Sequence, residues 1–194
     1  MAKYLILLFT VLSSSLLKAQ TFQPFKVVVT AGYAFPSGDY VKGGLASYLE
    51  AQYAINDKIS FGLSAGTAAI GPHKKSTFYP NEKFLGNAVM YMATGTYHFN
   101  TNKNRPFISL ASGLGIVNVH SIQNSRVDAY GIPTFDPAKS RVRKLIISPG
   151  AGIERDRLRL MAEYSYLGKA EGIGSSFLTL KAGIFVGGER RKEK

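Results

Sequence analysis

Cysteine and tryptophan are both absent from the 194-residue chain, and acidic residues are scarce, with 12 Asp and Glu against 24 Lys and Arg. Without cysteine the fold cannot rest on disulfide bonds, and a lipid anchor on an N-terminal cysteine is excluded. Beyond the first twenty residues, no run reaches the ~18 apolar residues that a membrane-spanning helix needs. These absences exclude a disulfide scaffold and a bundle of membrane helices.

The first residues have the layout of a secretory signal peptide. Lys3 supplies a positive start, residues 4–12 (YLILLFTVL) form a short apolar run, and cleavage is expected after Ala19. The alternative, an uncleaved anchor, would need ~20 apolar residues to span a bilayer. We therefore predict a signal peptide at 1–19, one folded domain at 20–186 and a basic tail at 187–194.

The formal net charge of +12 could indicate nucleic-acid binding. The basic residues, however, cluster neither on a predicted helix nor between stacking aromatics. They lie mostly in predicted loops and in the tail, so we expect no nucleic-acid partner.

Alternation of apolar and polar residues with period two recurs along the chain, and we find no helical period after the signal peptide. Residues 157–168, RLRLMAEYSYLG, are an example. A membrane-spanning β-strand needs ~9–11 residues, which suits the length of these runs. The eight predicted strands are 26–35, 45–55, 58–70, 85–99, 107–119, 144–154, 157–167 and 176–186.

Short and long connections between these strands alternate along the chain. The short ones are 56–57, 100–106 and 155–156, and the long ones are 36–44, 71–84, 120–143 and 168–175. An up-and-down barrel with tight turns at one end and long loops at the other produces this alternation. The predicted fold is all-β, a single eight-stranded antiparallel up-and-down transmembrane β-barrel.

The polar parity of the strands indicates which face points inward. In the predicted strands 58–70, 107–119 and 144–154 it is filled by Gly, Ala and Ser, which suit a narrow barrel interior better than an open surface. Larger polar residues would occupy the remaining space and pair, because an unpaired charge there would cost several kcal/mol. The predicted polar network of the lumen consists of Glu50, Gln52, Glu154, Arg159, Glu163 and Lys181.

The apolar parity would then face lipid, with a defect at Pro149. Proline cannot donate a ladder hydrogen bond, so we expect a bulge or a local break there. Aromatic residues near both ends of the strands are typical of the two girdles of a membrane barrel. A secreted lipocalin-like binder, with apolar residues lining a ligand cavity, is the alternative, but its interior would not be filled by Gly, Ala and Ser.

In these features the chain resembles the small eight-stranded outer-membrane β-barrels of Gram-negative bacteria, the OmpA/OmpX-like group. The resemblance covers about residues 22–186 and rests on pattern, since no short motif is diagnostic. It implies an outer-membrane protein that could be a monomer and that meets membrane lipids and the outer-membrane assembly machinery, with its short turns in the periplasm. One departure is that the chain continues beyond Phe185 with VGGERRKEK, whereas many such proteins end on an aromatic residue.

Basic residues in two predicted loops and at the following strand start suggest contact with lipopolysaccharide, because phosphate groups pair well with Lys and Arg. The alternative is that these are solvated loop charges. The candidate contact residues are Lys74, Lys75, Lys83, Arg126, Lys139, Arg141, Arg143 and Lys144.

We predict no catalytic residue, no cofactor and no metal site. An alternative function is a lipid A-modifying acyl hydrolase, for which His120 and Ser121 could be considered. Adjacent residues of a strand point to opposite faces, however, and a nucleophile and its base must approach within ~3 Å. The glycine pairs 113/115 and 150/152 lie inside strands, so they are not phosphate-binding loops.

Overall fold

The computed structural model describes residues 24–37, 41–72, 83–127, 133–170 and 173–188. The predicted signal peptide and residues 189–194 of the predicted tail lie outside these ranges. Among the described residues, no helix has both the length and the apolar character to span a membrane.

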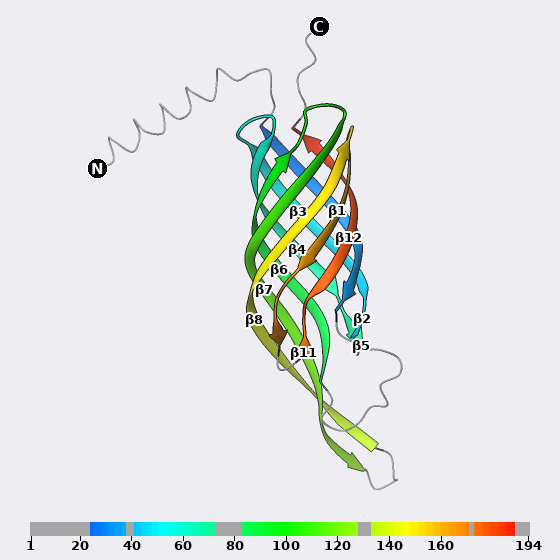
Figure 1. Ribbon diagram of the computed structural model, residues 1–194. Helices are drawn as coiled ribbons and strands as arrows, with labels where there is room; N and C mark the ends of the chain where they lie inside the picture. Colours follow the sequence, from blue (N-terminus) through cyan, green and yellow to red (C-terminus); the bar gives the residue numbers. More distant parts are fainter. Residues whose placement is uncertain (1–23, 38–40, 73–82, 128–132, 171–172, 189–194) are drawn as a thin grey trace, which may run out of the picture.

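Eight long strands close into one antiparallel barrel (Figure 1), which confirms the predicted fold class. The closing seam joins the first and last of them, and every other seam joins neighbours in the sequence. The strands are β1 Phe25–Pro36, β3 Gly44–Ala54, β4 Ile59–Ala69, β6 Lys83–His98, β7 Asn104–Val127, β8 Pro133–Arg155, β9 Leu158–Ser165 and β12 Phe177–Gly187. Two small antiparallel pairs add β2 (Val41–Lys42) with β5 (Gly71–Pro72), and β10 (Lys169–Ala170) with β11 (Ile173–Gly174).

The two ends of the barrel differ, and we call them the turn end and the loop end. At the turn end, Asn56 Oδ1 accepts hydrogen bonds from the backbone N–H groups of Lys58 (2.9 Å) and Ile59 (2.8 Å), which stabilises a tight turn. A two-residue turn joins β8 to β9, and its first residue, Asp156, has φ of 53°. β1 begins and β12 ends at this same end (Figure 1).

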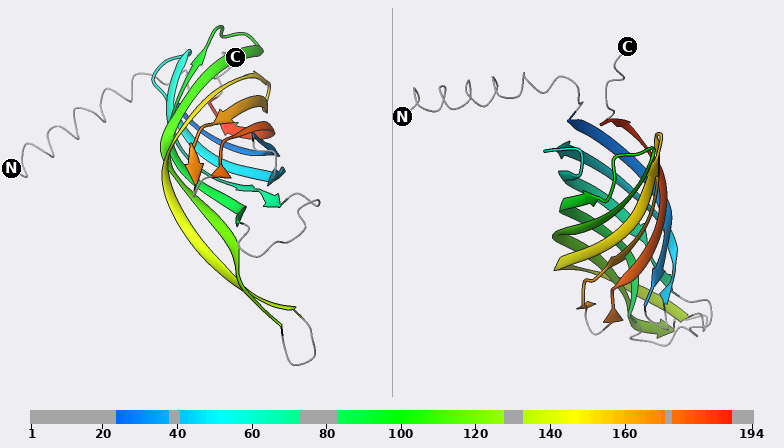
Figure 2. Two further views of the ribbon diagram at one scale, coloured as in Figure 1. Left: turned by 60° about the horizontal axis from the view of Figure 1, so that its bottom comes forward. Right: turned by 45° about the horizontal axis from the view of Figure 1, so that its top comes forward.

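A long β-hairpin extends from the loop end, past the rim of the barrel (Figure 2). It consists of the outer parts of β7 and β8, which pair as far as Val127 with Pro133. The prediction of a loop over 120–143 is therefore wrong, since 120–127 and 133–143 are paired strand. The alternation fades there because strand residues beyond the lipid need no apolar face.

The outer surface of the barrel is apolar. Along β9 the side chains alternate strictly between exposed and buried, with Leu158, Leu160 and Tyr164 outward and Arg159 and Glu163 inward. Leu63 on β4 is 72% exposed and Leu145 on β8 is 66% exposed. The faces are thus the reverse of those in a lipocalin, so that alternative is wrong.

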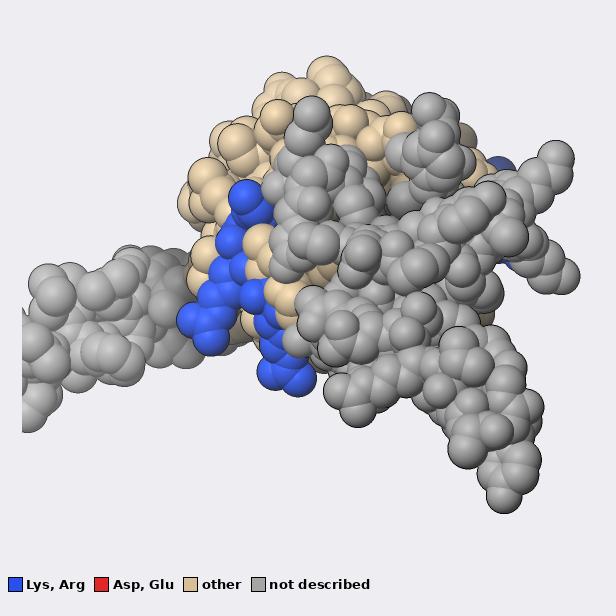
Figure 3. Space-filling model, turned by 90° about the horizontal axis from the view of Figure 1, so that it is seen from below, with Lys and Arg blue, Asp and Glu red and all other residues tan. Residues whose placement is uncertain are grey.

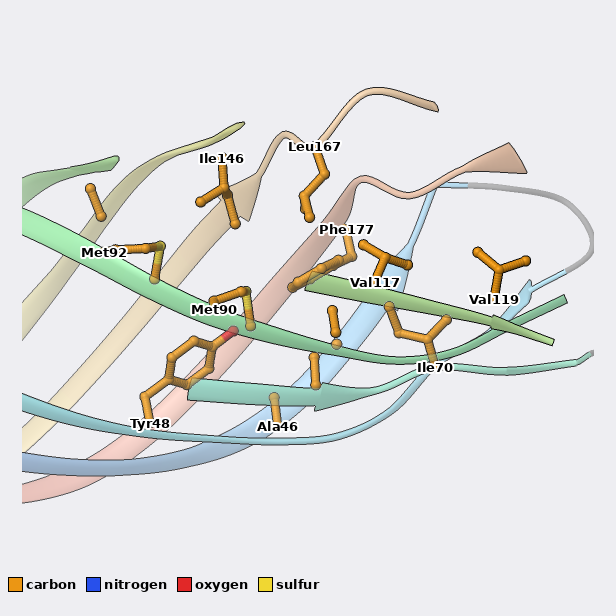
Figure 4. Close-up of a cluster of buried hydrophobic side chains, with 14 residues drawn as sticks. Ala46, Tyr48, Ile70, Met90, Met92, Val117, Val119, Ile146, Leu167 and Phe177 are labelled. Carbon is orange, nitrogen blue, oxygen red and sulfur yellow. The ribbon is translucent and has the colours of Figure 1, made fainter. Parts of the chain in front are cut away.

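The lumen has two chemically different halves. Toward the loop end it is filled by apolar side chains (Figure 4), among them Met90, Ile146, Leu167 and Phe177, each at most 3% exposed. The predicted polar residues lie in the turn-end half, beside the Phe107 and Phe185 rings, and the prediction of small and polar residues fails in the loop-end half. Inward residues such as Val117 and Val119 close this end with apolar groups instead.

Inward glycines make room for two aromatic rings. Tyr48 lies directly across from Gly66, and a Cβ built on Gly66 would lie 2.1 Å from the Tyr48 ring. Phe107 lies across from Gly152 in the same way, with a distance of 2.7 Å. A cross-strand ring covers the space that each glycine leaves, so the lumen is filled without strain.

Pro149 interrupts the seam between β8 and β9 without shifting its register. The pairs Ile147 with Tyr166 and Gly150 with Glu163 belong to one register, and no ladder pair is formed between them. The predicted break is therefore present, but the predicted bulge is not. On the lumen side, Ser148 Oγ donates to Ser165 Oγ at 3.0 Å and so ties the two strands together beside the gap.

Replacing Gly66 with Val should destabilise the barrel by at least ~2 kcal/mol, because the added methyl groups would collide with the Tyr48 ring. Gly95→Val is the matched control, since a Cβ there would lie 3.7 Å from its nearest neighbour. Urea unfolding of the barrel in lipid vesicles, monitored by the gel shift between folded and unfolded forms, measures both. Equal stability of the two variants would contradict this account of the lumen.

Candidate functional site: lumen network and cationic rim

The lumen network begins with Arg159 on β9, whose side chain is 1% exposed. Its guanidinium Nη1 lies 3.4 Å from Glu50 Oε2 and 3.6 Å from Glu154 Oε1, so one cation bridges β3 and β8 across the lumen. The same guanidinium lies over the Phe107 ring, 4.3 Å from its centroid. This cation–π contact anchors the planar group where water is excluded.

Glu154 has two further partners that the predicted network does not include. Lys26 Nζ on β1 lies 2.6 Å from Glu154 Oε1, and His98 Nε2 on β6 lies 3.1 Å from Oε2. The alternation of β6 and of β1 marks His98 and Lys26 as inward, and this was the available signal for both. Their partner is 56 and 128 positions away in the sequence, and only the closure of the barrel brings them together.

A second cluster lies around Lys181 on β12. Lys181 Nζ is 2.8 Å from Glu163 Oε1 on the adjacent β9 and 3.7 Å from the centroid of the Tyr48 ring.

Gln52 Nε2 and Thr94 Oγ1 both donate to Glu50 Oε1, at 2.8 Å and 2.6 Å. All six predicted network residues thus lie inward, and each has at least one polar partner in the network.

Three carboxylates of the described lumen, Glu50, Glu154 and Glu163, pair with the three cations Lys26, Arg159 and Lys181. The cavity at their level has a volume of about 20 Å³ and is lined by Tyr48, Arg159 and Lys181 among others. That volume accommodates about one water molecule. At this level the described lumen is therefore closely packed by the ion pairs and their neighbours.

The next feature is the distribution of His, Asp and Glu, residue types that often bind metals or transfer protons. No group of three or more His, Asp and Glu suited to a metal ion occurs among the described residues. His98 is 3% exposed and is held by Glu154. His120 and Ser121 occupy adjacent positions of β7, and their side chains lie outside the described part of the structure.

The second candidate feature is the cationic rim, which we define as Arg141 and Arg143 on β8. Both side chains are exposed and point outward. Arg143 lies one outward step, and Arg141 two, beyond the exposed Leu145. Lys144, which we predict to act with them, lies instead on the inward parity together with Ile146 and is half-buried. The prediction that Lys144 acts on the same surface as Arg141 and Arg143 is therefore wrong.

An outward row of polar groups accompanies the cationic rim. Asn118 Nδ2 on β7 donates to Asn87 Oδ1 on β6 at 2.6 Å, and Asn118 lies directly across from Arg141. Figure 3, a view onto the loop end, shows Lys and Arg side chains gathered on one side and no described Asp or Glu in view. The outward surface therefore changes from apolar to polar and cationic within one strand step.

The other predicted lipopolysaccharide contacts cannot be placed on this surface. Lys74 and Lys75 lie outside the described residues. Lys83, Arg126 and Lys139 belong to β6, β7 and β8, but their side chains lie outside the described part of the structure.

Replacing Glu154 with Gln should destabilise the barrel by ~3–5 kcal/mol, because Lys26 and Arg159 would lose a buried counter-charge. Asp156→Asn is the control, since it removes the same charge from an exposed turn and Asn tolerates positive φ. Urea unfolding in vesicles gives both values, and the double variant Glu154→Gln with Lys26→Met should recover part of the loss. A single variant as stable as the control would show that the pairing contributes nothing.

Comparison with known proteins supports the fold. No profile of a known protein family matches the sequence, and no curated protein sequence matches it. Among solved structures, Neisserial surface protein A (NspA) matches with a TM-score of 0.59 and 19% identity, over 86% of this chain and 98% of that one. Ail of Yersinia pestis matches at 0.48 and 17% identity, over 83% and 98%, and the N-terminal β-barrel domain of Pseudomonas aeruginosa OprF at 0.45 and 16%, over 85% and 99%. The chain has the fold of the small eight-stranded outer-membrane barrels, as its resemblance to the OmpA/OmpX-like group predicted.

Proposed function

We propose that the chain is an integral outer-membrane protein without enzymatic activity, whose loop end contacts phosphate-rich lipopolysaccharide. The observation that carries the proposal is the cationic rim at the edge of an apolar, outward-facing band. In this proposal the turn end faces the periplasm, and the chain is exported with its signal peptide removed.

The outer surface supports the membrane part of the proposal. Barrel strands such as β3, with 11 residues, have the length needed to cross hydrocarbon. Outward aromatic pairs lie near both ends, with Phe25 against Tyr53 at the turn end and Tyr33 against Phe35 at the loop end. Rings at these levels are typical of the two lipid–water boundaries.

The position of the cationic rim supports lipopolysaccharide as the partner. Arg143 is the first outward residue of β8 beyond Leu145, about 7 Å further along the strand. Cations at the hydrocarbon boundary lie at the level of lipid phosphates, with which guanidinium groups form charge-assisted hydrogen bonds. Within the described residues, no carboxylate forms a salt bridge with Arg141 or Arg143.

The packed lumen supports a role without catalysis or transport. Its buried carboxylates are paired with cations, and its loop-end half is filled by apolar side chains. Recognition would therefore belong to the outer surface and to the hairpin of β7 and β8, where a rigid scaffold presents groups to partners. As an outer-membrane barrel, the protein would depend on the outer-membrane assembly machinery. Phe185, the last aromatic residue of the chain, points into the lumen and is 5% exposed.

The double variant Arg141→Gln with Arg143→Gln should bind bis-phosphorylated lipid A roughly 30-fold more weakly, since each cation near an anionic surface contributes ~1 kcal/mol. Lys144→Gln is the control, because it removes one positive charge from the inward face of the same strand. Titration of the refolded barrel in micelles with fluorescent lipid A measures the affinities.

Two outcomes would contradict the proposed contact. One is an equal loss of affinity in Lys144→Gln and in the double variant. The other is wild-type binding that is unchanged when lipid A is dephosphorylated. A protein that stays in the aqueous fraction without detergent, and shows no gel shift on heating, would overturn the membrane assignment itself.

A further inference from the structure

Gly95 on β6 is an exception to the pattern of the barrel glycines. Its neighbours Thr94 and Thr96 are buried, so Gly95 lies on the outward, lipid-facing parity. Among the described glycines of the eight barrel strands, it is the only one on that parity. The inward glycines are explained by crowding in the lumen, but Gly95 is not in the lumen.

The protein's own packing does not require a glycine at this position. A Cβ added at Gly95 would lie 3.7 Å from Phe61 Cε1 and 3.9 Å from the Leu110 carbonyl oxygen, which are ordinary contact distances. φ at Gly95 is not positive. Glycine in a strand has a conformational cost and leaves nothing to pack, so a side chain here should improve the strand.

An open groove lies over Gly95 on the outer surface, with a volume of about 330 Å³. Gly95 forms its floor between Phe61 on β4 and Leu110 on β7, its direct partners in the two neighbouring strands. The next outward residue toward the turn end, Tyr97, closes the groove together with Ile59 and Ile108. The outward side chains of the lining are aromatic and aliphatic, the other lining residues, Ser60, Thr96 and Ser109, lie on the inward parity, and no lining residue is charged.

We propose that this groove binds one acyl chain of a phospholipid from the leaflet at the turn end. The inference rests on the proposed membrane location and goes beyond it by assigning a defined lipid site. The groove is continuous with the apolar outer band, so its occupant must be apolar. It lies in the turn-end half, immediately inside the ring pair Tyr97 and Phe99, whose centroids are 5.5 Å apart. A chain seated there would have its headgroup at the level of these rings, where amphipathic aromatic side chains meet the boundary.

The absence of tryptophan from the chain allows a direct test. Tyr97→Trp introduces a single fluorophore at the wall of the groove, and Phe25→Trp introduces one in the same aromatic belt on β1, away from it. Each variant is folded into phosphatidylcholine vesicles that contain a phosphatidylcholine brominated midway along its chains. Quenching in the Tyr97→Trp variant should correspond to an apparent lipid association constant about threefold larger than that in the Phe25→Trp variant, because the groove buries additional chain surface.

Filling the groove should abolish this difference. Gly95→Leu in the Tyr97→Trp background should bring quenching down to the level of the Phe25→Trp variant. Ala65→Leu, which places the same side chain at an outward position of β4 outside the groove, should leave it unchanged. The gel shift on heating verifies that each variant is folded, which is expected because Gly95 has space for a Cβ.

The three outcomes that contradict the prediction separate this inference from the proposed function. If neither variant is quenched, the barrel is not in the bilayer, and the proposed membrane location fails together with the site. If both are quenched equally and Gly95→Leu has no effect, the membrane location stands and the acyl-chain site is overturned. Quenching that is weaker in Tyr97→Trp than in Phe25→Trp, and that rises on dilution of the protein, would also overturn the site, because a second copy would then occupy the groove.

Discussion

The width of an eight-stranded barrel is the constraint on which the rest of this structure depends. The interior is wide enough for side chains to fill but not for a water column, so each inward residue must fit beside its neighbours. This explains why Tyr48 faces Gly66 and Phe107 faces Gly152. A large side chain on one strand leaves no space for a side chain at the facing position of the next strand. Because of the same lack of space, a charge that is buried in the lumen must be paired.

The ionic core shows how the pairing is achieved. Glu154 contacts cations from β1 and β9, and Arg159 contacts carboxylates from β3 and β8, so the interactions run around the barrel and across it. The backbone ladder joins only neighbouring strands. These side chains also link strands that are not neighbours, such as β1 with β8 and β3 with β9. Aromatic rings under Arg159 and Lys181 give each cation a further partner in place of water.

The period-two pattern predicts the strands of the barrel and their inward positions. It fails for the hairpin, where the strands extend past the barrel. Parity alone places Glu50, Arg159 and Lys181 in the lumen, because inward and outward positions alternate in the lipid-spanning part. Parity cannot pair Lys26 with Glu154, since that contact depends on how the strands are staggered when the barrel closes. The hairpin beyond the rim escapes prediction because a strand surrounded by water has no apolar face. Lys144 is misassigned when it is grouped with the loop cations, whereas its alternation with Leu145 places it inward.

A sealed lumen leaves the outer surface as the place where the described residues can meet partners, and that surface differs between its two ends. The cationic rim of Arg141 and Arg143 lies at the loop-end boundary, whereas the groove at Gly95 lies toward the turn end. In the proposed orientation the first meets a leaflet dense in phosphate and the second a leaflet of phospholipid. A cation is useful only where anions are concentrated, and an apolar groove only where flexible chains can enter it. The two features together would therefore favour one orientation and one depth of the barrel in an asymmetric bilayer, without any contribution from the lumen.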